Sequence, residues 1–508
     1  MSVFLARGSS AAAVLVISAQ SAFADVSAQD VWSDWKSYMT GVGYTVTGTE
    51  SQSGNTLTVS DIAMSFPIPD EEGATVSTTM SELKFVENGD GTVNILMPSD
   101  TPMLIEGSDG DDQFKIELIY THDGSPMVVS GDTSKMHYEY TTETATLTLG
   151  KIEGPEDELP ADALAASVVM SGLSTKTDMT IAGQRSYDQT MQVAELSYDF
   201  SFQEPEGSDN AMIKGALQNL VFTGTSTVPT GLESPDMGAL VKAGFGFDGN
   251  FTYGGGNSQL SGQDGRDSFE FQSSSTGGSL GVAMGQEGIS YDISQQGVSL
   301  NISGSEIPFP LALTMAELGF KLAMPILQSE DAQDFAMGVT LRDFAVPDML
   351  WGMVDPTGTL PHDPATIVLD LSGKAKLLFD LLDPKSIEAM ERGNQEPGEL
   401  NAVTIKALQV SAAGAELTGT GDFTFNNDDM ETFDGIPAPD GVANVKLTGA
   451  NGLIDKLIQM GLMSENDAMG ARMMMGMFGV PGEGEDTLTS EIKVSEDGQI
   501  HANGQRIK

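Results

Sequence analysis

The chain has 508 residues, with 73 acidic against 24 basic side chains and a net charge of −49 at neutral pH. So acidic a surface repels phosphate backbones and anionic head groups, which argues against nucleic-acid binding. Cysteine is absent and only four histidines occur, far apart, so the composition excludes disulfides, thiol nucleophiles, thiolate metal sites and a local His-rich metal motif.

The first residues have the pattern of a secretory signal. Arg7 precedes an apolar run at residues 11–19, and Ala22 and Ala24 flank Phe23 in a small-x-small cleavage site before Asp25. The apolar run is shorter than the roughly 20 residues that a membrane-spanning helix needs. We expect residues 1–24 to be a signal peptide, cleaved after Ala24, and the mature chain to be periplasmic or secreted with no transmembrane segment. An ordinary N-terminal helix is the alternative.

The first element expected in the mature chain is a helix. Ser27 with Asp30 three residues later forms a capping signal, and apolar residues at positions 31, 32, 35, 38 and 39 follow at helical spacing. Gly41 and Gly43 end this helix.

From residue 44 onward apolar residues alternate with polar ones. The alternating runs are residues 57–66, 83–85, 93–97, 114–120, 136–140, 145–149 and 196–202. Strict alternation is typical of antiparallel strands with one buried and one solvated face. The sequence therefore predicts a meander of many strands in the N-terminal half.

The composition shifts to glycine and serine near residue 230, where we place the boundary between two halves, 25–230 and 231–508. Residues 234–241 predict a short helix with a proline in its first turn. Strands then resume at 245–247, 251–253, 269–271, 291–293 and 298–302. Residues 307–384 are the least regular, with an expected helix at 329–335 and a proline-punctuated loop at 355–364.

The C-terminal stretch 414–508 combines strands and helices in one unit. Strands are expected at 415–425, 442–447 and 487–494, and a methionine-rich helical pair at 451–478. Ser464 with Asp467 marks the start of the second helix, and Gly479 to Gly482 its end. The fold class predicted for the whole chain is mainly β: two large antiparallel twisted sheets, or a half-open sandwich with a β-groove, and a few short packed helices.

Several short motifs occur in the second half of the chain. They are Met324-Pro-Ile-Leu, Asp334-Phe, Leu350-Trp, Asp355-Pro, Leu360-Pro-His-Asp-Pro-Ala, Leu369-Asp-Leu-Ser-Gly, Asp486-Thr-Leu-Thr-Ser-Glu-Ile and Asn503-Gly-Gln-Arg. With these motifs the sequence resembles the domain-of-unknown-function 2125 family of secreted alphaproteobacterial proteins, over nearly the whole mature chain. The family has no established activity, so the resemblance implies no functional residues. Residues 414–425 are also similar to strands of AsmA-related periplasmic proteins, a likeness that implies long curved sheets with an apolar groove and a role in lipid handling.

No catalytic or cofactor motif stands out. Residues 244–249 match a dinucleotide fingerprint in letters, but they follow an expected helix and lead into strands, the reverse of the required order. His362 beside Asp363 could form a base and acid pair, although adjacent residues in a proline-bounded turn rarely face each other. A pair of hydrolytic carboxylates among 73 acids stays open, because that chemistry depends on spatial separation. We expect no catalytic, cofactor or metal residues, and a protein that is not an enzyme.

The methionine-rich pair has three interpretations. Its apolar residues are Leu453, Leu457, Met460, Met469, Met473, Met477 and Phe478. They continue one helix stripe, which core packing explains. Thioether sulfurs also suit soft Cu(I). The third interpretation is an adaptable face for an apolar ligand, because methionine side chains conform to varied surfaces.

The first function predicted is therefore a non-enzymatic periplasmic protein that binds lipid or another apolar ligand in a β-groove and supports envelope maintenance. The alternative is a structural or protein-interaction module with a closed core and no ligand, with envelope proteins as partners. An unrecognised hydrolase is third.

Overall fold

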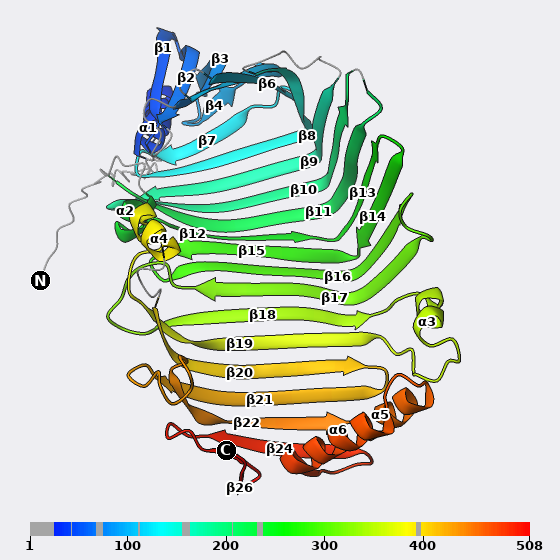
Figure 1. The fold of residues 1–508 in the computed structure, drawn as a ribbon. Coiled ribbons are helices and arrows are strands. Elements are labelled where there is room, and N and C mark those ends of the chain that lie inside the picture. The colour runs from blue at the N-terminus through cyan, green and yellow to red at the C-terminus, as the bar shows by residue number, and fades with distance from the viewer. Residues whose placement is uncertain are drawn as a thin grey trace, which may run out of the picture.

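The structure is a computed structural model that describes residues 25–41, 43–67, 75–109, 112–154, 163–205, 207–230, 237–392 and 398–508. The strands of these residues form one antiparallel sheet of 26 strands, and short helices lie at its ends and edges (Figure 1). The mainly β, antiparallel fold class is thereby confirmed. The expected signal peptide, residues 1–24, lies outside the described residues, and within them no helix has the length and apolar composition needed to cross a membrane.

The strands form one continuous sheet, whereas two separate sheets were one of the arrangements predicted from the sequence. Strand β11 (Asn210–Pro229) pairs with β10 on one side and with β12 and β13 on the other, so the hydrogen-bonded ladder crosses residue 230 without a break. The reason is that β12, which follows α2, returns to pair with β11, whereas a linker between separate sheets would have left β11 without this partner. The boundary near residue 230 stays a prediction.

The helices are α1 (Ala28–Gly41), α2 (Met237–Lys242), α3 (Asp348–Val354), α4 (Pro384–Glu391), α5 (Ala450–Gln459) and α6 (Glu465–Phe478). The strands of the first half, besides β11, are β1 (Thr45–Ser53), β2 (Thr56–Pro67), β3 (Thr75–Glu87), β4 (Val93–Leu96), β5 (Asp100–Asp109), β6 (Asp112–His122), β7 (Met127–Asp132), β8 (Lys135–Glu153), β9 (Leu164–Ile181) and β10 (Gln184–Gln203).

The strands of the second half begin with β12 (Gly246–Tyr253), β13 (Gly255–Asp264), β14 (Asp267–Ser275), β15 (Gly277–Gly285), β16 (Gly288–Gly304), β17 (Leu311–Met324), β18 (Gln333–Phe344) and β19 (Ala365–Leu377). They end with β20 (Gly398–Ala412), β21 (Ala415–Asn426), β22 (Ala438–Thr448), β23 (Val480–Pro481), β24 (Thr487–Val494), β25 (Ile500–Ala502) and β26 (Gln505–Arg506).

The main hydrophobic core lies under α1 at the N-terminal end of the sheet. The expected cap forms, because the Ser27 hydroxyl accepts a hydrogen bond from the Asp30 backbone N–H at 3.1 Å. Val31 and Trp32 of α1 are buried against Phe85 of β3 and other apolar side chains of the first strands. Burying such side chains contributes about 1.5 to 3 kcal/mol each, so α1 is fixed to this end of the sheet.

Long strands bend at one level across the sheet. We call this bend the corner. Strands β8 to β11, β16 and β17 each run through it without a break. At the same level β12 is followed by β13, and β14 by β15, as separate strands. Gly172, Asn219, Gly297 and Asp343 hold left-handed backbone at this level, with φ between 52° and 61°. Glycine, asparagine and aspartate tolerate that region best, so the sequence places suitable residues at the bend.

The corner closes a second, smaller core. Leu173, Val193 and Leu220 are buried there with Ala145, and tyrosine and methionine side chains from both arms of the bend pack around them. Side chains on the inner side of a bend approach one another, so the face that carries these residues is concave. We call it the concave face.

Two local predictions differ from the structure. Residues 329–335 are not a helix, because residues 329–332 are irregular and β18 begins at Gln333, where pairing with β19 outweighs the local helix pattern. The runs 136–140 and 145–149 are one strand, β8, and the runs 291–293 and 298–302 are one strand, β16. In each case the two predicted runs are the parts of one strand on either side of the corner. Helix α2 begins at Met237, and residues 231–236 lie outside the described residues.

An ion pair links α1 to the sheet below it. The Arg185 guanidinium of β10 bonds the Asp34 carboxylate, and both side chains are at least nine-tenths buried. Removing one partner of a buried pair leaves the other charged and without compensation.

We therefore expect Arg185→Met to lower the free energy of unfolding, measured by urea titration, by about 3 kcal/mol. Lys176→Met is the matched control, since it breaks the exposed pair between Lys176 and Glu139 and should cost no more than about 0.5 kcal/mol. Equal losses in the two variants would contradict the buried role of Arg185.

Candidate functional site

The concave face carries a row of apolar side chains that runs from strand to strand across the sheet. Cross-strand partners in the ladder bring these side chains side by side. The row consists of Met191, Phe222, Phe251, Leu280, Ile293, Phe320, Val339, Leu369, Leu408, Gly419 and Val445. We call it the central row.

Neighbouring rows on the same face are also free of charge. A flanking row consists of Leu318, Leu341, Ile367, Val410, Leu417, Leu447 and Leu488. On the other side of the central row, Gly249, Val282 and Tyr291 begin a similar row that ends at Ile492. Charged side chains of these strands, such as Asp292 and Lys321, alternate onto the opposite face.

The rows are open to solvent in the middle of the sheet. Phe251, Leu280, Ile293 and Phe320 are between 37% and 40% exposed, and Ile367 is 44% exposed. Figure 1 shows the described helices beside the ends of the strands and at the two ends of the sheet, and the middle of these strands is drawn without a helix across it. A contiguous apolar surface of this kind is a candidate binding site.

Aromatic rings of this face lie over glycines in neighbouring strands. A Cβ atom added at Gly249 would lie 2.9 Å from the Phe222 ring, and one added at Gly262 would lie 2.5 Å from the Phe269 ring. The same closeness joins Gly373 to Phe335. The rings therefore lie along the sheet, in the space that a side chain at each glycine would fill.

A cavity of about 300 Å³ lies at the N-terminal end of the concave face, between α1 and strands β8 to β11. Its phenol groups come from Tyr38, Tyr138 and Tyr187. Burial raises the pKa of Tyr187 to about 12 and also raises the pKa of Tyr38 and of Tyr138. These hydroxyls stay protonated at neutral pH and can both donate and accept hydrogen bonds.

A second cavity, of about 250 Å³, lies at the C-terminal end. Helix α6 contributes Met474, Met475 and Phe478, and the sheet contributes members of the concave rows, among them Leu447 and Leu488. Helix α6 thus covers the last strands of the concave face and leaves a space beneath it.

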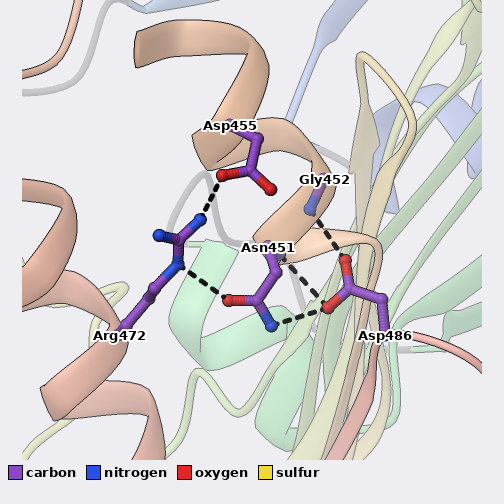
Figure 2. Close-up of polar contacts among 5 residues, drawn as sticks. All are labelled: Asn451, Gly452, Asp455, Arg472 and Asp486. Atoms are coloured by element: carbon purple, nitrogen blue, oxygen red, sulfur yellow. Dashed lines mark hydrogen bonds and ion pairs between the residues drawn. The ribbon is translucent and has the colours of Figure 1, made fainter. Parts of the chain in front are cut away.

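Polar contacts fix this pair of helices to the end of the sheet (Figure 2). The Asp486 carboxylate accepts hydrogen bonds from the backbone N–H groups of Asn451 and Gly452 at 3.2 and 2.9 Å, at the start of α5. Arg472 of α6 donates to the Asn451 side chain at 3.2 Å and pairs with Asp455. Burial raises the pKa of Asp486, but the hydrogen bonds outweigh it and hold that pKa below its usual range.

The predicted apolar residues of α5 and α6 do not share one face. Leu453, Leu457, Met460 and Phe478 are half-buried, whereas Met469, Met473 and Met477 are 65%, 72% and 50% exposed. Core packing of this methionine stripe is therefore wrong, because α6 meets the sheet with Ala468, Met475 and Phe478 instead. The expected helices, 451–478, and the cap of Ser464 on the Asp467 backbone N–H at 3.1 Å are confirmed.

Sequence reasoning missed most of the concave face. One signal in the sequence would have found it. In β10 the apolar residues occupy odd-numbered positions up to Val193 and even-numbered positions from Leu196 onward. The same change occurs in β16 between Ile293 and Val298. Each change marks a bend that keeps apolar side chains on one face.

His362, the candidate base, contacts an aromatic ring and two carboxylates. His362 stacks on Trp351 with ring centroids 4.5 Å apart, and its nearest carboxylates are Asp355 and Asp348, at 3.7 and 4.0 Å. Asp355 is buried and accepts a hydrogen bond from the Leu360 backbone N–H at 2.6 Å, which holds the loop that leads to His362. Residues 244–249 pass from α2 into β12, which is the order predicted.

Comparisons with known proteins identify part of the chain. Residues 251–502 match the model of a family described as an uncharacterized protein conserved in bacteria, DUF2125. That stretch belongs to this family, so the resemblance predicted from the sequence is confirmed over it, although the likeness was expected to cover nearly the whole mature chain. No curated protein matches the chain. The resemblance to AsmA-related proteins stays a prediction.

The placement of the methionines predicts their oxidation rates. Under mild peroxide treatment we expect Met469 and Met473 to form sulfoxide at least about tenfold faster than the buried Met136 and Met179, because reaction requires access to the sulfur. Peptide mass spectrometry over time measures the rates. Similar rates for the two pairs would contradict the outward orientation of the α6 stripe.

Proposed function

We propose that this chain is a non-catalytic periplasmic protein that binds the acyl chains of lipids along the concave face and serves envelope maintenance. The single observation that carries the proposal is the set of uncharged, half-exposed apolar rows, which continue from the cavity under α1 to the cavity under α6. The periplasmic location rests on the predicted signal at residues 1–24.

The dimensions of the central row suit acyl chains. From Phe251 in β12 to Val445 in β22 the row crosses the sheet at about 4.8 Å per strand, or roughly 40 Å in all. The hydrocarbon core of a bilayer is about 30 Å thick and holds two layers of chains. The row is therefore long enough for more than one acyl chain laid end to end.

Acyl chains fit the chemistry of the face better than a polypeptide does. The backbone groups of these strands are already paired within the ladder, and the rows offer almost no side-chain donors or acceptors. A peptide laid along the rows would bury its own N–H and C=O groups without partners, which costs free energy for each group. A hydrocarbon chain has no such groups.

The alternative with a closed core finds less support. Closed packing would bury the central row, yet Phe251, Leu280 and Phe320 keep about two-fifths of their surface exposed. Most of the large apolar side chains that are fully buried gather under α1 and at the corner, and Val241 of α2 is an exception.

A charge placed in the central row tests the proposal. We expect Ile293→Glu to weaken binding of a pyrene-labelled diacylglycerol by about tenfold or more, because the lipid would have to desolvate a carboxylate. Ser294→Glu is the matched control, since it adds the same charge one residue away on the opposite face and should leave affinity within about twofold.

Fluorescence titration measures both affinities, and thermal unfolding verifies that both variants fold. Wild-type protein that does not bind the probe would refute acyl-chain binding. Equal affinities for the two variants would show that the lipid binds elsewhere.

A further inference from the structure

The cavity under α1 differs in chemistry from the rows that lead to it. Its walls carry the phenols of Tyr38, Tyr138 and Tyr187, the hydroxyl of Thr177 and the amide of Gln189. The indole of Trp35 adds a flat apolar surface. Aromatic planes beside neutral donors and acceptors suit a ring that carries hydroxyl groups.

The charges at this cavity cancel. Asp34 lines it, and its carboxylate is bound by Arg185, so the pair adds no net charge. The phenols are protonated at neutral pH, because burial raises the pKa of each. An anionic group would have to compete with Asp34 for Arg185, against the repulsion of a chain of net charge −49.

The cavity and the acyl rows lie on the same face and are adjacent. In the ladder, Gln189 and Thr177 stand opposite each other, and Gly224 is the next member of their row. The Phe222 ring of the central row covers Gly224 and packs on Phe251 at 4.8 Å between centroids. A molecule with a polar end in the cavity can therefore extend its apolar end over Phe222 onto the central row.

We propose that the cavity under α1 is a headgroup site that takes an uncharged, hydroxyl-bearing group, such as one hexose, of a lipid whose chains lie on the concave face. This inference rests on the proposed function. At about 300 Å³ the cavity has the volume of about ten water molecules, which is room for one such ring.

The test compares three lipids with identical acyl chains: monoglucosyl diacylglycerol, diacylglycerol and phosphatidic acid. Each is titrated into the full mature chain, and the dissociation constant is measured by Trp fluorescence and by native mass spectrometry. We expect the glucosyl lipid to bind about tenfold more tightly than diacylglycerol, because a few neutral hydrogen bonds to the sugar hydroxyls add to the acyl-chain contacts. Phosphatidic acid should bind no more tightly than diacylglycerol.

The variant Thr177→Val/Gln189→Leu removes neutral polar groups from the cavity and leaves the ion pair intact. It should bind diacylglycerol as wild type does and lose the preference for the glucosyl lipid. Thr190→Val, on the opposite face of β10, is the control and should keep the preference. Thermal unfolding verifies that both variants fold.

The outcomes separate this inference from the proposed function. Equal binding of glucosyl lipid and diacylglycerol to wild type overturns the headgroup site and leaves acyl-chain binding in place. Tighter binding of phosphatidic acid than of diacylglycerol would overturn the assignment of an uncharged headgroup to this cavity. Failure of all three lipids to bind overturns the proposed function itself, and a preference that survives in Thr177→Val/Gln189→Leu places the headgroup outside this cavity.

Discussion

Each strand of the sheet places alternate side chains on opposite faces, and this alternation decides where every apolar side chain of the sheet can lie. A bend normally upsets it, because one extra residue moves all later side chains to the other face. Here the irregular residues, among them Gly172, Asn219 and Gly297, lie at one level in successive strands. The register is the same on both sides of the corner, so the sheet bends and keeps one uncharged face.

Helices α1, α5 and α6 complete this arrangement, because α1 lies at one end of this face and α5 and α6 lie at the other. Helix α1 closes the first end with a conventional core, in which Val31 and Phe85 are fully buried. Helices α5 and α6 cover the last strands, held by Asp486 and Arg472. Between the ends, the ladder and the cross-strand pairs stabilise the sheet, no second layer covers it in the part of the chain that the structure describes, and the apolar rows remain accessible.

The sequence was sufficient for features that depend on local spacing. The helix after Ser27, the alternating strands, the capped helix after Ser464 and the mainly β class follow from periods of 3.6 and 2 and from capping residues. The sequence was insufficient where pairing between distant segments determines the local structure. Residues 329–335 have a helical pattern, yet pairing with β19 draws residues 333–335 into a strand. Core packing was one of three interpretations of the stripe that carries Met469 and Met473, and the sequence could not exclude it because composition does not tell which side of α6 meets the sheet.

The central claim is that the concave face holds acyl chains, and the most direct measurement is native mass spectrometry of the protein purified without detergent from its own cells. The account predicts a mass above that of the mature chain, and release on denaturation of lipids that carry acyl chains. A mass equal to that of the chain alone, with no lipid in the organic extract, would contradict it.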